Sequence, residues 1–341
     1  GMTSIMENGA RVPTIALALG DPAGTGPELA ARAIALPEVR AAMRLIVVGD
    51  KRVFDAGAAT AGVACDCTVV RIGTAPPRGS AQPVFVDLEN LDPAHVERGV
   101  ASAAGGRFAL ANYAQALELV LDEYADAVCF TPFNRSALRL ADAAYEDELR
   151  FTGGALGTFG AVSEFDIADR VWCARVTSHV PMAQMPSLLT VEAIVGALKL
   201  THAALRDAGF TPPRIAVAAL NPHAGDDGAF GREEIEIISP AIRAAQGRGI
   251  RADGPFAADS IFLRAYRGEF DAVLTMYHDQ GRIAMRLLGF ERGVTLLGGF
   301  PFPICTPVHG TGYDIAGKGV AKVGAMRATL LLAAEMVRRA S

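Results

Sequence analysis

The sequence predicts an α/β protein with mostly parallel sheets. Short apolar runs at 14–19, 44–49 and 127–130 alternate with longer stretches of helical periodicity at 101–123 and 190–208. This alternation is typical of parallel strands that are joined by crossing helices. With 341 residues, the chain is long enough for two lobes, each around its own core.

Composition and charge limit the classes of partner. Hydrophobic residues make up 51% of the chain and charged residues 20%, which indicates a folded protein rather than a disordered one. A net charge of −5 argues against nucleic acid or an anionic membrane as the main partner. No run approaches the ~18 apolar residues that a membrane span needs, and 328–337 is expected to be a packed terminal helix.

The cysteines and the first residues bear on the cellular compartment. Residues 1–10 lack the apolar core of a signal peptide. The cysteines number five, and Cys65 and Cys67 have no second pair with which to bind a metal. Reduced thiols in a cytoplasmic protein are therefore expected.

The first strand, 14–19, runs into the glycine-rich segment GDPAGTGPE at 20–28. Pro27 suits the first turn of a helix over about 28–36. Gly24 and Gly26 would let the backbone approach a ligand, and the helix start offers N–H groups to an anion. An ordinary strand-to-helix turn explains the segment equally well, and it lacks the GxGxxG pattern of dinucleotide-binding turns.

The other elements follow from apolar runs, helical spacing and punctuating residues. Thr190 suits the N-cap and Gly209 the C-terminal glycine of a helix over 190–208. The acidic stretch 145–149 is expected to be a surface loop or a short insertion. Further strands are expected at 44–49, 67–72, 84–87, 127–130, 171–177, 214–220, 271–274 and 293–297, and further helices at 101–123, 136–143 and 233–245.

Three histidines, His179, His223 and His278, follow expected strands closely, the last in DAVLTMYHDQG at 271–281. Catalytic groups of open α/β sheets gather past the carboxyl ends of strands. Imidazoles from three strand ends can bind one divalent ion and leave positions open for water or substrate. Hydrogen-bonded structural histidines are the alternative interpretation.

Charged residues near these histidines have several possible roles. Asp259 and Asp279 could orient a ligand histidine or act as general acid or base. The arginines could hold an anionic substrate or form surface ion pairs; they are Arg135, Arg282, Arg286 and Arg292.

Four motifs follow one another along the chain: GDPAGTGPE at 20–28, SHVP at 178–181, LNPHAG at 220–225 and MYHDQG at 276–281. In this order they resemble the 4-hydroxythreonine-4-phosphate dehydrogenase family. The resemblance extends over about 14–338. In addition, HGTGYDIAGKG at 309–319 is similar to the adenosine-binding loop of isopropylmalate and isocitrate dehydrogenases, which places the family in the β-decarboxylating dehydrogenase superfamily.

The resemblance implies an isopropylmalate-dehydrogenase-like fold of two lobes with the active site in the cleft between them. The expected lobes are 1–135 with 281–341 on the cofactor side, and 136–280 on the metal and dimer side. The family is homodimeric, with each metal site completed across the subunit interface. Its members oxidise a secondary alcohol with NAD or NADP and then release the adjacent carboxylate as CO2.

Site residues carry over from the family by position. The resemblance implies a divalent metal (Zn, Mg, Mn or Co) on His179, His223 and His278, with Asp259 and Asp279 as the catalytic acids. Binding of NAD or NADP is implied for Gly24, Gly26, His309, Gly310 and Asp314.

The expected substrate pocket departs from the family pattern. Gly154 and Ala155 stand where family members have His and Thr of a phosphate-binding motif, Ile304 replaces an arginine, and Thr295 replaces an asparagine. Arg286 and Arg135 keep a positive charge at lysine positions. Loss of charge-assisted contacts weakens phosphate binding. We therefore expect a small anionic hydroxy acid, with a non-phosphorylated hydroxy diacid preferred.

Alternative functions differ in their cofactors. Similar departures occur in terephthalate-type cis-dihydrodiol dicarboxylate dehydrogenases. A three-histidine metal hydrolase or aldolase would have no need of the 309–319 loop, and a non-catalytic relative would have no need of the histidines and aspartates. The sequence thus favours a metal-dependent, NAD(P)-linked oxidative decarboxylase.

Overall fold

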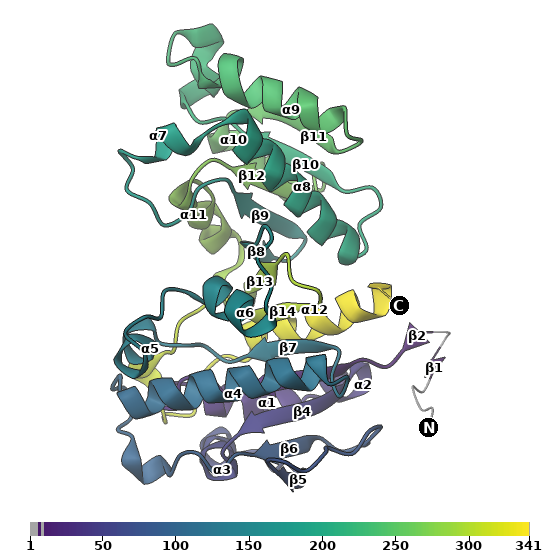
Figure 1. Ribbon diagram of the computed structural model, residues 1–341, viewed down its shortest axis with the longest axis vertical. Coiled ribbons are helices and arrows are strands. Elements are labelled where there is room, and N and C mark those ends of the chain that lie inside the picture. Colours follow the sequence, from purple (N-terminus) through teal and green to yellow (C-terminus); the bar gives the residue numbers. More distant parts are fainter. Residues whose placement is uncertain (1–5, 8–9, 341) are drawn as a thin grey trace. The chain divides into compact units, whose positions relative to one another are not determined.

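A computed structural model describes residues 6–7 and 10–340 of the chain. The inference about a signal peptide in residues 1–10 therefore lies mostly outside the described residues. The chain forms two compact units: unit 1 contains the residues up to 159 and from 300 onward, and unit 2 contains residues 160–299. Figure 1 shows the elements of both units.

The strands of unit 1 confirm the predicted parallel sheet. Its order is β14-β7-β3-β4-β6-β5, and all of these pairings are parallel. A separate short hairpin pairs β1 with β2. The strands are β1 (Met6–Glu7), β2 (Ala10–Arg11), β3 (Thr14–Ala18), β4 (Arg44–Gly49), β5 (Thr68–Arg71), β6 (Val84–Asp87), β7 (Ala127–Phe130) and β14 (Ile304–Pro307).

Helices cover both faces of this sheet. Neighbouring residues of a strand point to opposite faces, so two such residues contact different helices. The ring of Phe130 on β7 packs on Tyr113 of α4, whereas Sγ of Cys129 faces the Thr329 carbonyl of α12. The helices and 3₁₀ turns are α1 (Gly26–Ile34), α2 (Pro37–Ala42), α3 (Lys51–Ala61), η1 (Pro93–His95), α4 (Ala103–Leu121), α5 (Arg135–Ala141), α6 (Glu148–Leu156), η5 (Tyr313–Ile315) and α12 (Gly324–Ala340).

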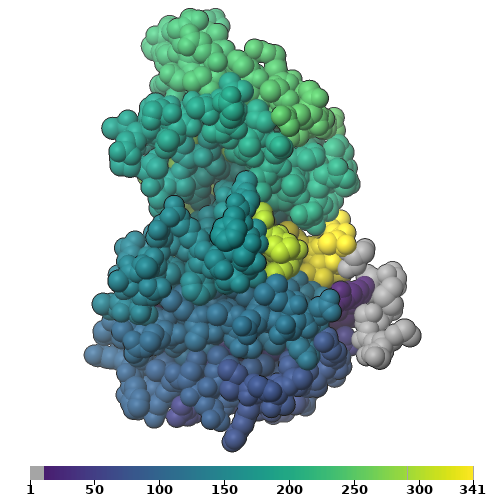
Figure 2. Space-filling model, viewed as in Figure 1, coloured from purple at the N-terminus to yellow at the C-terminus, as the bar shows by residue number. Residues whose placement is uncertain are grey.

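Apolar burial in the central strands of unit 1 is nearly complete. Four consecutive residues of β3, from Ile15 to Ala18, are fully buried. Such a strand reads as a continuous apolar run because both of its faces are covered. In the space-filling view, this unit shows mostly the blue of the chain around α4, and little of the purple of β3 and β4 (Figure 2).

Unit 2 has a mixed sheet of order β11-β10-β12-β9-β8-β13. Strand β8 is antiparallel to both of its neighbours, and the other pairings are parallel. The strands are β8 (Ser163–Ala168), β9 (Val171–Arg175), β10 (Arg214–Ala218), β11 (Arg251–Phe256), β12 (Ala272–Thr275) and β13 (Val294–Gly298).

The helices of unit 2 include the predicted capped helix α8. Thr190 Oγ1 accepts a hydrogen bond from the Ala193 N–H, and Gly209 follows the helix with a φ of 97°. The helices and turns are α7 (Met185–Leu188), α8 (Val191–Asp207), η2 (Pro222–Gly228), the π-helical η3 (Glu234–Ile238), α9 (Ser239–Gln246), α10 (Ala258–Tyr266), α11 (His278–Gly289) and η4 (Phe290–Arg292).

The unit boundaries differ from the expected lobes, 1–135 with 281–341 and 136–280. Residues 136–159 belong to unit 1, because α5 and α6 pack on α4. Residues 281–299 belong to unit 2, because α11 packs on β8, β9 and β12, and β13 pairs with β8.

The expectation of a surface loop or a short insertion at 145–149 was only partly right, because residues 145–147 are non-helical, whereas residues 148 and 149 belong to α6. Tyr145 is buried, and its ring lies 6.3 Å from that of Phe151 on α6. Helix α6 begins at Glu148, with the side chain of Asp147 accepting a hydrogen bond from the Arg150 N–H. Asp147 was thus a helix-capping signal within this acidic stretch. Among the described helices, none combines the length and apolarity that crossing a bilayer requires.

Candidate functional site

In unit 2, helix α11 begins directly after β12 and packs closely on the sheet. Gly281 makes this approach possible, because a Cβ there would lie 2.4 Å from Sγ of Cys173 and 3.1 Å from Cγ2 of Thr275. The close contact holds the first turn of α11, which carries His278 and Asp279, at the carboxyl end of β12.

We predict that Gly281→Val destabilises the protein by about 1–3 kcal/mol through overpacking. Chemical denaturation monitored by circular dichroism would measure the change. Gly154→Ala is a matched control, because a Cβ at Gly154 on α6 meets no atom within 4 Å, and alanine favours a helix. Equal stability of the Gly281 variant and the wild type would contradict the packing role.

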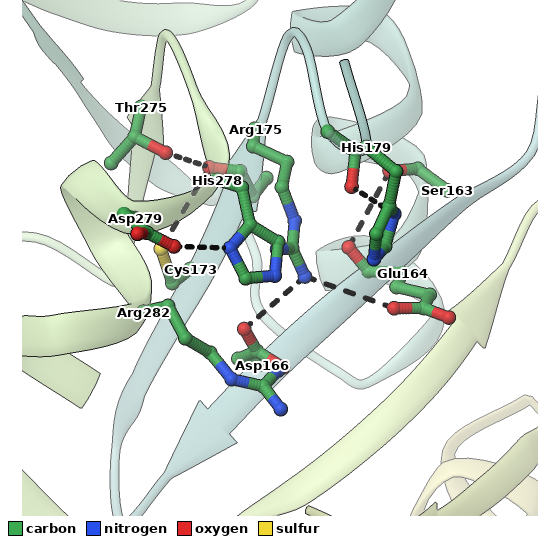
Figure 3. A network of polar contacts seen from close by, with 12 residues as sticks. Ser163, Glu164, Asp166, Cys173, Arg175, His179, Thr275, His278, Asp279 and Arg282 are labelled. Carbon is green, nitrogen blue, oxygen red and sulfur yellow. Dashed lines mark hydrogen bonds and ion pairs between the residues drawn. The ribbon is translucent and has the colours of Figure 1, made fainter. Parts of the chain in front are cut away.

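The structure brings His179 and His278 together, as Figure 3 shows. Their ring centroids lie 5.2 Å apart. Nδ1 of His278 lies 2.7 Å from a carboxylate oxygen of Asp279, and Nδ1 of His179 lies 3.0 Å from Oγ of Ser178. Contacts at Nδ1 orient an imidazole and leave Nε2 as the atom for a metal ion.

His223 belongs to a different local structure. It lies in η2, where five consecutive residues have left-handed φ angles, with φ of 54° at His223 itself. The buried carboxylate of Glu234 holds this segment by accepting hydrogen bonds from the N–H groups of Leu220 and Asn221, at 2.8 and 2.9 Å. Left-handed non-glycine residues are costly and often mark functional sites.

A divalent ion fits the His179–His278 pair. A ring centre lies about 3.2 Å from a metal that its nitrogen binds, so tetrahedral ligation separates two centres by about 5 Å. The observed separation agrees with this value. Within the part of the chain that the structure describes, however, no three metal-binding side chains form one group, so His223 does not join the pair.

The other predicted residues of unit 2 lie at different distances from the pair. Thr295 is nearly buried on β13 and stands opposite Asp166 in the β13–β8 register. Arg286 is exposed on α11, two turns beyond His278. Asp259 is exposed in the first turn of α10, a helix that contacts η2.

A buried ionic network below the histidines escaped the sequence prediction (Figure 3). Asp166 on β8 lies 2.9 Å from Arg282 of α11 and 3.3 Å from Arg175 of β9. Arg175 also lies 3.8 Å from Glu164. The signal that could have revealed the network is strand periodicity, which places Glu164 and Asp166 on one face of β8.

In unit 1, the 309–319 segment packs against the glycine-rich 20–28 segment. The Thr25 N–H donates to the Thr311 carbonyl at 2.8 Å, and a Cβ on Gly24 would lie 2.3 Å from the same oxygen. The Tyr313 hydroxyl donates to Asp21 at 2.9 Å. Burial raises the pKa of Asp21, and this hydrogen bond and that from the Ala23 N–H oppose the effect.

Gly24 and Gly26 both allow the start of α1 to pack closely against other segments of unit 1. A Cβ on Gly26 would lie 2.6 Å from Oγ1 of Thr131. Beside these segments lies a cavity of about 170 Å³, whose lining includes Pro22, Gly24, Glu28, Arg98 and Gly317. Gly310 and Asp314 are exposed on the same loop.

His309 fits a role in binding a dinucleotide. Its Nδ1 lies 2.9 Å from the Gly310 carbonyl oxygen, which can only accept, so Nδ1 carries the proton. In the tautomer with its proton on Nδ1, Nε2 is an acceptor, and this atom is buried without a partner among the described residues. A donor such as the amino group of adenine would satisfy it.

The expected substrate-pocket residues of unit 1 do not form one surface. Gly154 and Ala155 are exposed on α6, and Arg135 is exposed at the start of α5. Ile304 is fully buried on β14 and pairs with Val128 of β7. Ile304 is therefore a core residue of the sheet and does not line a pocket, contrary to the expectation that it belongs to the substrate pocket.

The α/β fold of each unit, the oriented histidine pair of unit 2 and the 309–319 loop of unit 1 agree with the dehydrogenase class. The model of the family "Pyridoxal phosphate biosynthetic protein PdxA" matches residues 41–333. The chain belongs to this family. Its relatives are named as dehydrogenases, so the chain is an enzyme of the oxidoreductase class.

Two relatives and two solved structures illustrate the similarity. A protein of Rhizobium meliloti, provisionally named 4-hydroxythreonine-4-phosphate dehydrogenase 2, is 55% identical over 96% of this chain and 94% of its own length. D-threonate 4-phosphate dehydrogenase of Cupriavidus necator is 34% identical over 96% of this chain and 98% of its own length.

The solved structures confirm the fold class. That of 4-hydroxythreonine-4-phosphate dehydrogenase from Klebsiella pneumoniae has a TM-score of 0.80 at 31% identity, over 95% of this chain and 99% of its own. That of a terephthalate 1,2-cis-dihydrodiol dehydrogenase from Burkholderia xenovorans has a TM-score of 0.64 at 28% identity, over 93% of this chain and 96% of its own.

Proposed function

We propose that the protein is a metal-dependent, NAD(P)-linked dehydrogenase that oxidises and decarboxylates a small anionic hydroxy acid. The observation that carries the proposal is the pairing of His179 with His278, each oriented through Nδ1. Family membership supports the same class of reaction. The resemblance further favours a cytoplasmic homodimer that acts in pyridoxine-related metabolism.

The residues of unit 2 would bind and orient the substrate end that reacts. His179 and His278 supply imidazole nitrogens, which suit Zn or Co better than Mg. A divalent ion bound there would polarise a substrate hydroxyl and its neighbouring carboxylate. Asp279 holds the ring of His278 in place, and the guanidinium groups of Arg175 and Arg282 lie in an ionic network with Asp166 in the same unit.

The residues of unit 1 would bind the dinucleotide. His309, Gly310 and Asp314 lie on one loop. Gly24 lets that loop pack against the start of α1, and Gly26 lets α1 begin close to Thr131. NAD or NADP would accept the hydride of the alcohol.

We predict that His309→Ala weakens NAD binding about tenfold, because the loss of one hydrogen bond usually costs about that factor in affinity.

Calorimetric titration with NAD would test this prediction. His95→Ala, an exposed histidine of the same unit, is the control and should bind NAD as the wild type does. An unchanged dissociation constant for His309→Ala would remove His309 from the cofactor site, whatever its effect on turnover.

The choice of substrate rests on the relatives. Their names point to phosphorylated four-carbon hydroxy acids, and the terephthalate relative supports a cyclic dihydroxy diacid as a second candidate. The expectation of a substrate without phosphate now rests on the resemblance at Gly154 and Ala155, because Ile304 is a core residue.

A screen of hydroxy acids at fixed metal concentration tests the proposed function. Nicotinamide reduction at 340 nm and CO2 release would be followed for 4-hydroxythreonine-4-phosphate, D-threonate 4-phosphate and a terephthalate dihydrodiol. We expect both signals with one of these acids, and loss of both after chelation of the metal. Hydrolysis or aldol cleavage without nicotinamide reduction would instead favour the three-histidine hydrolase or aldolase.

A further inference from the structure

Arg175 has a buried donor group that no contact of unit 2 explains. Its side chain is 5% exposed, and its Nη2 atom makes the ion pairs with Asp166 and Glu164. Its Nη1 atom is buried and has no hydrogen-bond partner among the described residues. A buried donor without an acceptor is destabilising. The arrangement therefore calls for an acceptor that comes from outside the chain.

The chain places Arg175 beside both candidate metal-binding histidines. Arg175 lies four residues before His179. It pairs in register with Thr275 of β12, and Thr275 lies three residues before His278. In Figure 3, its side chain extends between the two histidines toward Asp166 and Glu164. A substrate at the histidine pair would thus lie next to this guanidinium.

The neighbouring charges keep Arg175 in place but do not occupy all of its donors. Asp166 is shared with Arg282, and Glu164 lies at the longer distance of 3.8 Å from Nη2. Arg175 and Arg282 balance the two carboxylates in number. The network therefore has no excess positive charge. What remains is the N–H donor at Nη1 of Arg175, which needs an acceptor in a defined direction.

We propose that Arg175 is a specificity-determining residue that binds an acceptor on the substrate carbon next to the carboxylate, and that it excludes an ammonium group there. A hydroxyl or a carboxylate oxygen can accept a hydrogen bond from Nη1, whereas an ammonium has only donors and carries the same charge as the guanidinium. This inference rests on the proposed function and specifies its substrate as a 2-hydroxy acid rather than a 2-amino acid.

The names of the relatives supply a matched pair of probes. D-threonate 4-phosphate carries a hydroxyl next to the carboxylate, and 4-hydroxythreonine-4-phosphate carries an ammonium there. Both have the same carbon chain length, carboxylate and phosphate. Their affinities for the metal-loaded protein without NAD, measured by calorimetry, report on recognition apart from turnover.

We expect the wild type to bind the threonate about a hundredfold more tightly than the amino acid. A site that donates a hydrogen bond to a hydroxyl strongly rejects an ammonium, which cannot accept that bond. Arg175→Met should reduce that preference to a few-fold while leaving metal content unchanged. Asp166 keeps its contact with Arg282 in this variant, so the network is not left unpaired. Arg292→Met, which removes an exposed ion pair of the same unit, should keep the full preference.

The outcomes separate this inference from the proposed function. Equal affinities in the wild type, or a preference for the amino acid, overturn the role of Arg175 even if Arg175→Met does not fold. An unchanged preference in a folded Arg175→Met protein does the same, and in both cases the dehydrogenase proposal stands. Failure of the wild type to bind or oxidise either acid overturns the role of Arg175, and failure with the terephthalate dihydrodiol as well overturns both.

Discussion

His278→Ala is expected to lower metal affinity and dehydrogenase activity by about a hundredfold or more. Substitution of partners that only orient a metal ligand costs 10–100-fold, and loss of the ligand itself should cost at least as much. Two features fix the position of the His278 ring. His278 is the first residue of α11, and its Nδ1 contacts the carboxylate of Asp279. Metal content after dialysis and kcat/KM would be measured together.

His202→Ala is the matched control, since His202 lies on α8 of the same unit. It should keep both metal and activity. His223→Ala is the informative third variant, because the structure does not place His223 in one group with the pair. A loss as large as that of His278→Ala would show that His223 contributes to the metal site in the assembled protein. Full metal content in His278→Ala would contradict the metal site.

Asp166→Ala is expected to destabilise the protein by about 3–5 kcal/mol, the cost of leaving a buried ion pair without one partner. Asp166 is 5% exposed and contacts two arginines, of which Arg175 is equally buried. Without Asp166, the guanidinium of Arg175 would keep only the longer contact to Glu164. Urea denaturation and differential scanning calorimetry would measure the loss.

A second ion pair of the same unit supplies the control. Asp169 and Arg292 are 36% and 59% exposed, and solvent screens such pairs to about 0–1 kcal/mol. Asp169→Ala should therefore change stability little. Similar losses in Asp166→Ala and Asp169→Ala would mean that water reaches the Asp166 network. A double variant, Asp166→Leu with Arg175→Met, should recover part of the loss, because apolar side chains can replace a buried ion pair.

Local signals in the sequence predicted most strands and several helices. The strands β4, β6 and β7 have the expected bounds, and α8 has the expected N-cap Thr190 and the glycine at 209. These features depend on residues a few positions apart, such as apolar runs and capping side chains, so a single sequence contains them. The histidine pair was also predictable, because His179 and His278 follow two strands that prove to be neighbours.

Pairing between distant segments explains what the sequence could not predict. Asp166, Arg175 and Arg282 meet because β8 runs antiparallel beside β9 and α11 packs on both, and no local pattern encodes that register. Ile304 could have been a pocket wall or a core residue by its chemistry, and its burial beside β7 made it core. Composition, periodicity and motifs thus established the α/β class and the candidate ligands, whereas strand register and burial established the ionic network that lies beside them.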